Sequence, residues 1–347
     1  MASSGNLTLR PSTASGTIGV GSATGTLSLA ASLFSGASRI FTDGFSGITI
    51  GASNGGAITV GGVVAFTDSA TLLSGGNITL NSGASVSSSQ ASGTLALAAG
   101  GNFVNNAGSS AVSTTDPGAN DRWIVYSANS ANASFGPAAN NVLVSGNGAV
   151  WGQTFSTLVP SSVASGNRYV FGNSPSVTAQ TTNLTKTYGD TPSLSSALSI
   201  TMGAASTSAY NAPTIAEVFS TLPTLTSSGT AASATVAGGP YTITASGGVV
   251  NSGFTVTYSN TGTLTVNPKA LTLSSAAAVS KTYDGTNAAT LTGTLSGILF
   301  SDDVSASLAG TFASANAGTG IAVTSTSTLT GTKAGNYTLT QPTGLTA

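Results

Sequence analysis

The residues that could perform chemistry in this chain are few, and two common types are missing. The chain has 347 residues, of which nine are acidic and eight basic, and it contains neither histidine nor cysteine. The most frequent general base and the thiolate ligands of metal ions are therefore absent. Residues 51–55 (Gly-Ala-Ser-Asn-Gly) match the Gly-x-Ser-x-Gly pattern of a nucleophilic serine, but such a site also needs a histidine partner and a strand-to-helix turn. We expect a turn between strands at Ser53, with no catalytic residue and no cofactor.

Carboxylates are the remaining candidates for catalysis or cation binding. The only acidic residues before residue 190 are Asp43, Asp68, Asp116 and Asp121. Polysaccharide-cleaving enzymes use carboxylate clusters, and Asp43 and Asp68 could lie on successive turns of a coiled chain, within reach of a cation or a sugar. Neighbouring Gly, Ser or Pro residues favour a turn-capping role instead.

A second pair of acidic residues lies near the end of the chain. Asp302 and Asp303 are adjacent and could contribute to a calcium site, but no further acidic residue is nearby in the sequence. We therefore favour a solvated turn and expect no metal site in the chain.

A Lys-Thr-Tyr motif occurs twice, 95 residues apart, at residues 186–188 and 281–283. Tyr188 and Tyr283 could face a ligand, as aromatic residues do in lectins, but their repetition favours packing. Asp190 and Asp284 are then expected to bond the following turn. An isopeptide bond between either lysine and an asparagine is an alternative; no ligand-binding residue is identified.

The elements before these motifs are short alternating strands. They are separated by Gly, Ser and Asn turns, and their apolar residues recur at every second position. The strands occupy residues 6–9, 16–20, 26–29, 47–50, 57–60, 77–80 and 94–97. Their first apolar residues suggest a repeat of about 20 residues through Leu7, Leu27, Ile48, Ile78 and Leu95. This spacing predicts a parallel β-helix over residues 1–115, with inward aliphatic columns and outward threonines.

Two further regions follow. Large aromatic residues gather after residue 116, including Trp123, Trp151, Tyr169 and Phe171, and predict a cap and linker over residues 116–182. The repeated motif then predicts two modules, at residues 183–268 and 269–347, the second truncated. Their size and alternating strands suit small β-sandwich or β-grasp-like folds. The expected fold class is all-β and elongated.

Composition excludes several partners. Charged residues make up 5% of the chain, against roughly 25% in ordinary soluble domains, and the net charge is −1. The basic residues are scattered, so we expect no nucleic-acid partner. Mean hydropathy is +0.28, yet no apolar run is long enough for a membrane helix. Residues 1–5 lack the features of a secretory signal, so an exported protein would contain this chain as an internal fragment.

These segments resemble the filamentous haemagglutinin-like adhesins of two-partner secretion. Residues 6–97 resemble the family's right-handed β-helix, and residues 121–127 (Asp-Arg-Trp-Ile-Val-Tyr-Ser) and 167–171 (Asn-Arg-Tyr-Val-Phe) resemble the segment that ends it. The motif at residues 186–190 (Lys-Thr-Tyr-Gly-Asp) is similar to MBG domains. Residues 281–286 (Lys-Thr-Tyr-Asp-Gly-Thr) and 335–339 (Gly-Asn-Tyr-Thr-Leu) are similar to YDG domains.

The resemblance implies a non-catalytic stalk of a secreted or surface-exposed adhesin at the Gram-negative outer membrane. The resemblance also implies a monomer. Its implied partners are a host-cell or surface receptor, either a glycan or a protein, and an outer-membrane transporter for the full-length protein. The family's secretion domain is not visible in the sequence. A polysaccharide-binding or polysaccharide-cleaving β-helix is the alternative, and an ice-binding solenoid is a third possibility suggested by the outward threonines.

Overall fold

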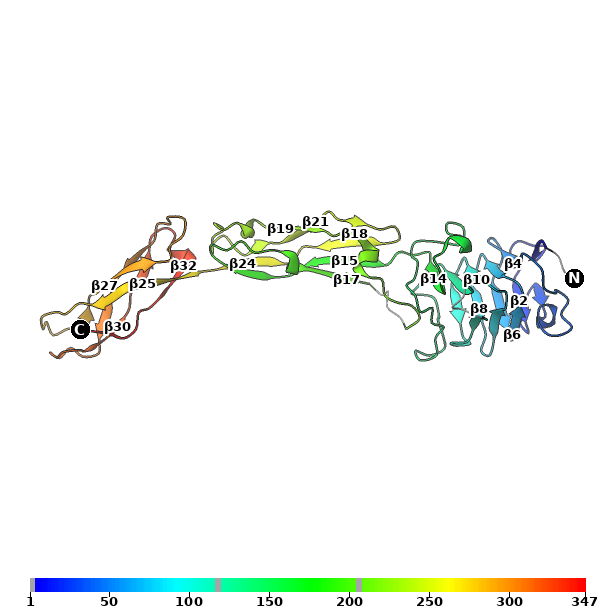
Figure 1. Ribbon diagram of the computed structural model, residues 1–347, viewed down its shortest axis with the longest axis horizontal. Helices are drawn as coiled ribbons and strands as arrows, with labels where there is room; N and C mark the ends of the chain where they lie inside the picture. Colours follow the sequence, from blue (N-terminus) through cyan, green and yellow to red (C-terminus); the bar gives the residue numbers. More distant parts are fainter. Residues whose placement is uncertain (1–3, 116–119, 204–207) are drawn as a thin grey trace. The chain divides into compact units, whose positions relative to one another are not determined.

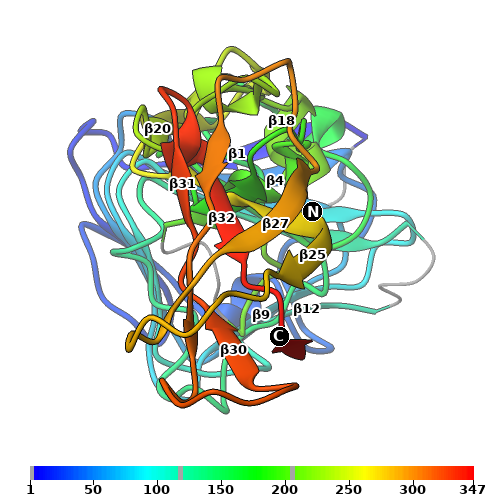
Figure 2. The same ribbon diagram turned by 90° about the vertical axis from the view of Figure 1, so that its left-hand side faces the viewer.

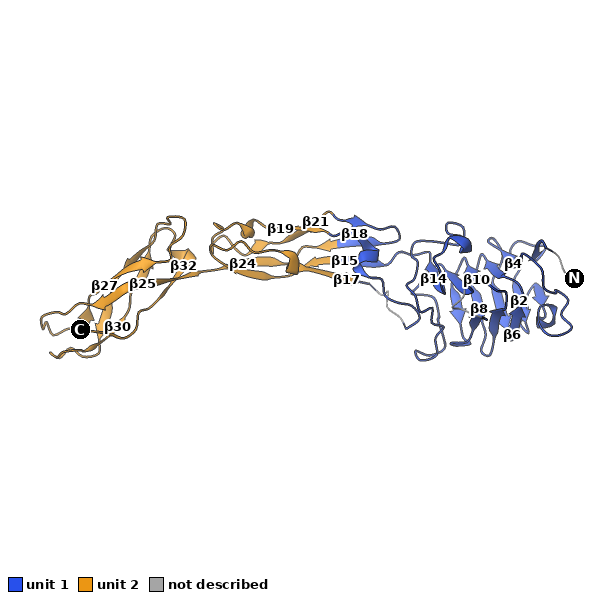
Figure 3. Ribbon diagram, in the orientation of Figure 1, with its two compact units in different colours: residues 1–178, 202–222, 248–257 blue, residues 179–201, 223–247, 258–347 orange. Residues whose placement is uncertain are grey.

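The computed structural model describes residues 4–115, 120–203 and 208–347. The chain divides into two compact units, which Figure 3 colours separately. Unit 1 comprises residues 1–178, 202–222 and 248–257, and unit 2 comprises residues 179–201, 223–247 and 258–347. Strands dominate both units, so the predicted all-β class is confirmed. In the described part of the chain, no helix has the length and apolar character needed to cross a membrane.

Unit 1 contains a coil of three parallel sheets (Figure 1). The first sheet runs β1 (Asn6–Leu9), β4 (Gly47–Ala52), β7 (Ala70–Ser74), β10 (Thr94–Ala99), β13 (Arg122–Ser127) and β14 (Arg168–Phe171). The second runs β11 (Phe103–Asn105), β8 (Ile78–Leu80), β5 (Ile58–Gly61), β2 (Ile18–Gly21) and β3 (Leu27–Leu29). The third runs β12 (Val112–Thr114), β9 (Ser85–Ser88) and β6 (Val63–Phe66). The chain visits the sheets in turn, which confirms the predicted parallel winding.

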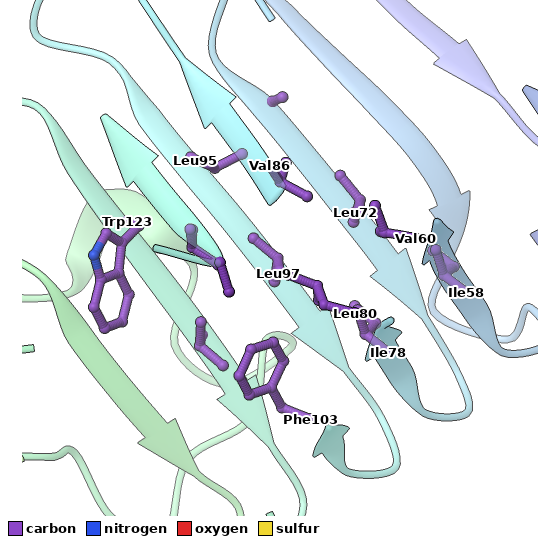
Figure 4. Close-up of a cluster of buried hydrophobic side chains, with 14 of the residues drawn as sticks. Ile58, Val60, Leu72, Ile78, Leu80, Val86, Leu95, Leu97, Phe103 and Trp123 are labelled. Carbon is purple, nitrogen blue, oxygen red and sulfur yellow. The ribbon is translucent and has the colours of Figure 1, made fainter. Parts of the chain in front are cut away.

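Apolar columns fill the inside of this coil (Figure 4). Residues at equivalent positions of successive strands are register partners, and the innermost column contains Ile50, Leu72, Leu97 and Val125, all 0% exposed. Each such aliphatic side chain contributes roughly 1.5–3 kcal/mol by leaving water. Threonines on the outer face are also register partners, Thr8 with Thr49 and Thr59 with Thr79. The alternation read from the sequence therefore assigns the inner and outer faces correctly.

The predicted set of equivalent positions is wrong in two places. Leu27 pairs with Ile18 and Ile78 pairs with Ile58, so both lie in the second sheet, whereas Leu7, Ile48 and Leu95 lie in the first. In the first sheet Ile48 pairs with Ala70, Ala70 with Leu95, and Leu95 with Trp123, so these coils are 22, 25 and 28 residues long. Strands of different sheets alternate alike, and the corners vary in length, so spacing alone could not assign strands to sheets.

Aromatic side chains gather in the last part of the coil. Phe171 is stacked on Tyr169, with ring centroids 5.9 Å apart, and Trp151 lies 4.9 Å from Phe171. Tyr210 also joins this cluster, 5.4 Å from Phe171. β13 and β14 continue the first sheet into the segment expected to form a cap, because Ile124 pairs with Arg168.

The modules that follow are built of smaller sheets. The sheet β17 (Leu198–Met202), β15 (Ser176–Thr181), β23 (Thr255–Ser259) has the same order as β27 (Leu291–Ser296), β25 (Lys269–Ala278), β32 (Tyr337–Thr340). In each sheet, the strand that comes first in the sequence is central. Figures 1 and 2 both show β25, β27 and β32 side by side. β25 pairs antiparallel with β27 and parallel with β32.

The remaining elements complete the two modules and the connections. The other sheets are β16 (Leu184–Thr187), β24 (Thr263–Asn267), β20 (Tyr241–Thr242); β18 (Phe219–Thr221), β22 (Val249–Val250); β19 (Thr224–Thr226), β21 (Thr244–Ser246); β26 (Ala288–Ala289), β29 (Gly310–Phe312), β30 (Ala322–Ser325), β33 (Leu345–Thr346); and β28 (Ser305–Ser307), β31 (Thr328–Thr330). The helical elements are α1 (Ile215–Val218) and the 3-10 turns η1 (Ala31–Leu33), η2 (Pro160–Ser162), η3 (Ser195–Ala197), η4 (Ser228–Thr230) and η5 (Ala334–Asn336).

Candidate functional site

The first Lys-Thr-Tyr motif lies at the end of β16 and closes a tight turn. The Asp190 amide N–H donates to the Thr187 carbonyl at 3.0 Å, and the Thr187 amide N–H donates to Asp190 Oδ2 at 3.2 Å. Gly189 has a φ of +98°, and a Cβ at this position would collide with Leu299. The backbone conformation therefore favours glycine here, and the end of the Leu299 side chain packs closely against it. Asp190 bonds within its own turn, not the following one.

Tyr188 projects from this turn into a buried cluster and is 2% exposed. Its hydroxyl donates to Asp302 Oδ2 at 2.9 Å, and its ring meets Phe300 and Tyr337 edge to face, at centroid distances of 5.8 and 5.3 Å. Burial, followed by the hydrogen bond to the Asp302 carboxylate, raises the pKa of Tyr188 to about 12. The prediction that this tyrosine packs is confirmed.

Asp302 accepts a second tyrosine hydroxyl. Tyr337, which is 5% exposed, donates to the same Oδ2 at 2.6 Å and accepts from the Leu299 amide N–H at 3.1 Å. Burial raises the pKa of Tyr337 as well. A charge-assisted hydrogen bond is roughly twice as strong as a neutral one. The two bonds to the Asp302 carboxylate therefore stabilise the positions of both tyrosine side chains.

The loop that carries Asp302 has an unusual backbone. Phe300 and Ser301 have φ values of +55° and +57°, a left-handed conformation that costs about 1–3 kcal/mol for residues other than glycine. The Asp302 amide N–H donates to the Leu299 carbonyl at 2.9 Å and closes the loop. The contacts of Leu299 with Gly189 and of Asp302 with Tyr188 offset this cost.

The remaining charged residue of the first motif, Lys186, has a buried side chain that is 5% exposed. Its Nζ donates to the carbonyl oxygens of Asp190 at 3.1 Å and Ala231 at 2.5 Å. Burial lowers the pKa of this ammonium group. The Lys186 side chain therefore links the motif's turn to the segment around Ala231, which is distant in sequence but also in unit 2.

The second motif forms a similar turn but lies at the surface. Lys281 Nζ lies 2.9 Å from Asp284 Oδ1 and donates to the Thr286 carbonyl at 2.9 Å. Asp284 accepts from the Thr286 amide N–H at 2.9 Å, which confirms that it bonds the following turn. The hydrogen bond from Lys281 is the main reason why the pKa of Asp284 is lowered to about 2. Tyr283 is 67% exposed, so the prediction that it packs like Tyr188 is wrong.

The adjacent acidic residues Asp302 and Asp303 face different partners. Asp302 binds the two tyrosines, whereas Asp303 Oδ2 accepts from the Thr332 amide N–H and hydroxyl, each at 3.0 Å. These bonds from Thr332 lower the pKa of Asp303. Asp302 is thus a half-buried acceptor for two tyrosine hydroxyls, rather than the freely solvated turn residue expected. Across residues 4–115, 120–203 and 208–347, no three His, Cys, Asp or Glu side chains are grouped to hold a metal ion.

The structure brings Asp43 and Asp68 together on successive coils. Asp68 is 1% exposed, and its Oδ1 accepts from the Gly44 amide N–H at 3.0 Å. Burial, with a contribution from the nearby Asp43 carboxylate, raises the pKa of Asp68. The proximity expected from the sequence is confirmed, and the backbone bond ties one coil to the one before it.

The other candidates of unit 1 are structural where they are described. Asp121 Oδ1 accepts from the Gly93 amide N–H at 3.1 Å and so also joins successive coils. The Gly55 amide N–H donates to the Ala52 carbonyl at 2.8 Å, which places Ser53 in the expected turn after β4. Asp116 lies outside the described residues.

The residues that sequence reasoning missed are the partners of Tyr188. Asp302 is 114 residues away from it, and no local pattern links the two. Tyr337 stands out in the sequence only as part of the Gly-Asn-Tyr segment at residues 335–337. The motif itself gives no signal for these partners, because its second copy leaves Tyr283 largely exposed.

Comparison with known proteins identifies one part of the chain. Residues 267–344 match the model of the YDG domain, which includes the second Lys-Thr-Tyr motif and the loop of Asp302. The predicted YDG part of the chain is therefore confirmed. Searches of curated proteins and of solved structures found no match.

Proposed function

We propose that the chain is a structural stalk segment of a large secreted or surface-exposed bacterial adhesin of the filamentous haemagglutinin type. In this proposal residues 183–268 are an MBG-like module, the full-length protein is exported by an outer-membrane transporter, and the chain is a monomer that catalyses no reaction. The observation that carries the proposal is the combination of a parallel β coil with a YDG domain in one chain. The adhesins that the sequence resembles combine these two kinds of element.

The internal design of both units supports a structural role. The coil is held by backbone pairing and aliphatic columns, and the described part of the chain has a single ion pair, Lys281–Asp284. Repeated small modules, each contacting its neighbours, suit a protein that holds a receptor-binding region away from a cell. The receptor in this proposal is a host-cell or surface glycan or protein.

Surface display and attachment can be tested in the bacterium that produces the protein. Antibodies raised against the purified chain are expected to label intact cells or the medium, and in-frame removal of residues 1–347 is expected to reduce attachment to host cells. A matched strain lacking only residues 269–347 shows whether the coil alone is sufficient. Labelling confined to lysed cells, or undiminished attachment after full removal, contradicts the proposal.

A second candidate function is binding or cleavage of polysaccharide at Asp43 and Asp68. The observation that favours it is the buried Asp68 with a raised pKa beside a second carboxyl group, an arrangement suited to general acid catalysis. Depolymerisation of a polysaccharide should then disappear in Asp68→Asn. It should persist in Asp121→Asn, which alters a buried carboxylate with a comparable backbone bond. A parent chain without measurable cleavage or binding over a broad polysaccharide panel removes this candidate.

A further inference from the structure

Tyr283 stands beside a surface hollow of the YDG domain and is 67% exposed. The hollow has both motif residues and apolar side chains in its lining, among them Lys281, Asp284, Phe312, Ala315, Ile321 and Ala347. Lys281 and Asp284 are paired with each other at 2.9 Å, so the charges at its rim are balanced locally. A large aromatic side chain left in water beside a hollow with apolar residues in its lining marks a surface suited to a partner.

The first motif shows what covers a tyrosine in this position. Tyr188 is enclosed by the loop of residues 299–302, which belongs to the YDG domain and therefore to the module that follows. Leu299 lies against Gly189, the Phe300 ring meets the Tyr188 ring, and Asp302 accepts the Tyr188 hydroxyl. One loop thus supplies an aliphatic contact, an aromatic contact and a carboxylate.

The path of the chain places each tyrosine near the point where the next module starts or would start. The Tyr188 amide N–H donates to the Asn267 carbonyl at 2.9 Å, and the YDG domain begins at this point, since β25 starts at Lys269. Ala347 lies at the hollow together with Tyr283, and its backbone pairs with Ile321. A module joined after Ala347 would therefore start beside Tyr283, as the YDG domain starts beside Tyr188.

We propose that the hollow around Tyr283 is the docking surface for the 299–302 loop of a further YDG domain joined after Ala347. The incoming carboxylate accepts a hydrogen bond from the Tyr283 hydroxyl, and the incoming aliphatic and aromatic side chains pack against the apolar residues of the lining. Each YDG domain then gives its loop to the module before it and its tyrosine to the module after it. The inference concerns assembly of the modules and does not depend on adhesion.

Chemical accessibility of Tyr283 tests this directly. We compare the chain with an extended chain in which a second copy of residues 268–347 follows Ala347. The added copy carries the substitution corresponding to Tyr283→Phe, so that Tyr283 occurs once. Both chains are acetylated with N-acetylimidazole, and the modified tyrosines are located by mass spectrometry. Tyr283 should react readily in the chain as it is. In the extended chain its rate should fall at least about tenfold, because reaction then requires opening of the joint.

Matched variants separate docking from a general effect of the extension. Substitutions corresponding to Leu299→Ala and Asp302→Asn, made only in the added copy, should restore the reactivity of Tyr283. A second extended chain with a flexible Gly-Ser linker of about 20 residues before the added copy should also protect Tyr283, even if the direct joint does not fold. Unchanged reactivity of Tyr283 in both extended chains overturns the proposal, as does protection that survives the two loop substitutions.

Discussion

The two Lys-Thr-Tyr motifs have the same residue types but opposite surroundings. In both, the lysine Nζ donates to a backbone carbonyl near the turn and an aspartate accepts a backbone N–H of the turn. Tyr188 is buried, whereas Tyr283 is largely exposed. The comparison teaches that the local sequence determines the turn, whereas the neighbouring module determines whether the tyrosine side chain is buried.

Removal of the tyrosine ring should give the largest difference between the motifs. We expect Tyr188→Ala to lower the free energy of unfolding of unit 2 by about 3–5 kcal/mol, the range for large buried aromatic residues. Tyr283→Ala should have little effect, because most of that side chain is already in water. Urea unfolding followed by circular dichroism measures both. Tyr188→Phe, which loses only the hydroxyl, is the control and should cost about 1–3 kcal/mol. Equal losses at residues 188 and 283 would break the comparison.

Removal of the lysine should give the next largest difference. Lys186→Ala is expected to destabilise unit 2 by about 2–4 kcal/mol, because a buried side chain and its two charged hydrogen bonds to backbone carbonyls are lost together. Lys281→Ala should change stability little, since its partners are exposed to solvent. The same unfolding experiment applies. Lys186→Met retains the apolar stem, so a stability equal to that of the parent chain would show that the hydrogen bonds contribute nothing.

Alkaline titration should distinguish the buried Tyr188 from the exposed Tyr283 of the second motif. The pKa of Tyr188 is raised from 10.0 to about 12, so the neutral form is favoured in the folded state. Its contribution to stability is complete below pH 10 and is lost as the pH rises through about 12. Other buried tyrosines, Tyr337 among them, also have raised pKa values, so the ionisation of Tyr188 is taken from the difference in tyrosinate absorbance between the parent chain and Tyr188→Phe. This late ionisation should move toward lower pH in Leu299→Ala, which opens the cover. An unchanged titration curve would mean that Leu299 does not keep water from Tyr188.

Acid titration of the exposed motif should show the smallest effect. The pKa of Asp284 is held at about 2, below its ordinary value of 3.8, chiefly by the hydrogen bond from Lys281. The support that this carboxylate gives to the turn is therefore present above pH 3.8 and is lost as the pH falls through about 2. Lys281→Gln should move the titration of Asp284, followed by NMR, toward 3.8. A carboxyl that titrates identically in the variant would assign the shift to Thr286 alone.

The sequence predicted the local features of the molecule better than its long-range contacts. Alternation identified the inward Ile50 and the outward Thr49 because each strand has a period of two. It could not tell that Leu27 and Ile48 belong to different sheets, because strands of every sheet alternate in the same way. The repetition of Tyr188 and Tyr283 suggested equal packing, yet burial depends on a loop that only one of them meets. Asp302 could not be assigned as the partner of Tyr188, because nothing in its local sequence distinguishes an acceptor for a distant tyrosine from a turn residue.

The unequal lengths of the coils have a consequence for how such a protein can evolve. Ile50, Leu72 and Leu97 remain register partners although 22 residues separate the first two and 25 the next two. The difference is absorbed entirely at the corners, where an inserted segment leaves the stacked core untouched. A lineage can therefore vary the corners independently, turning individual ones into recognition loops while inheriting the scaffold unchanged.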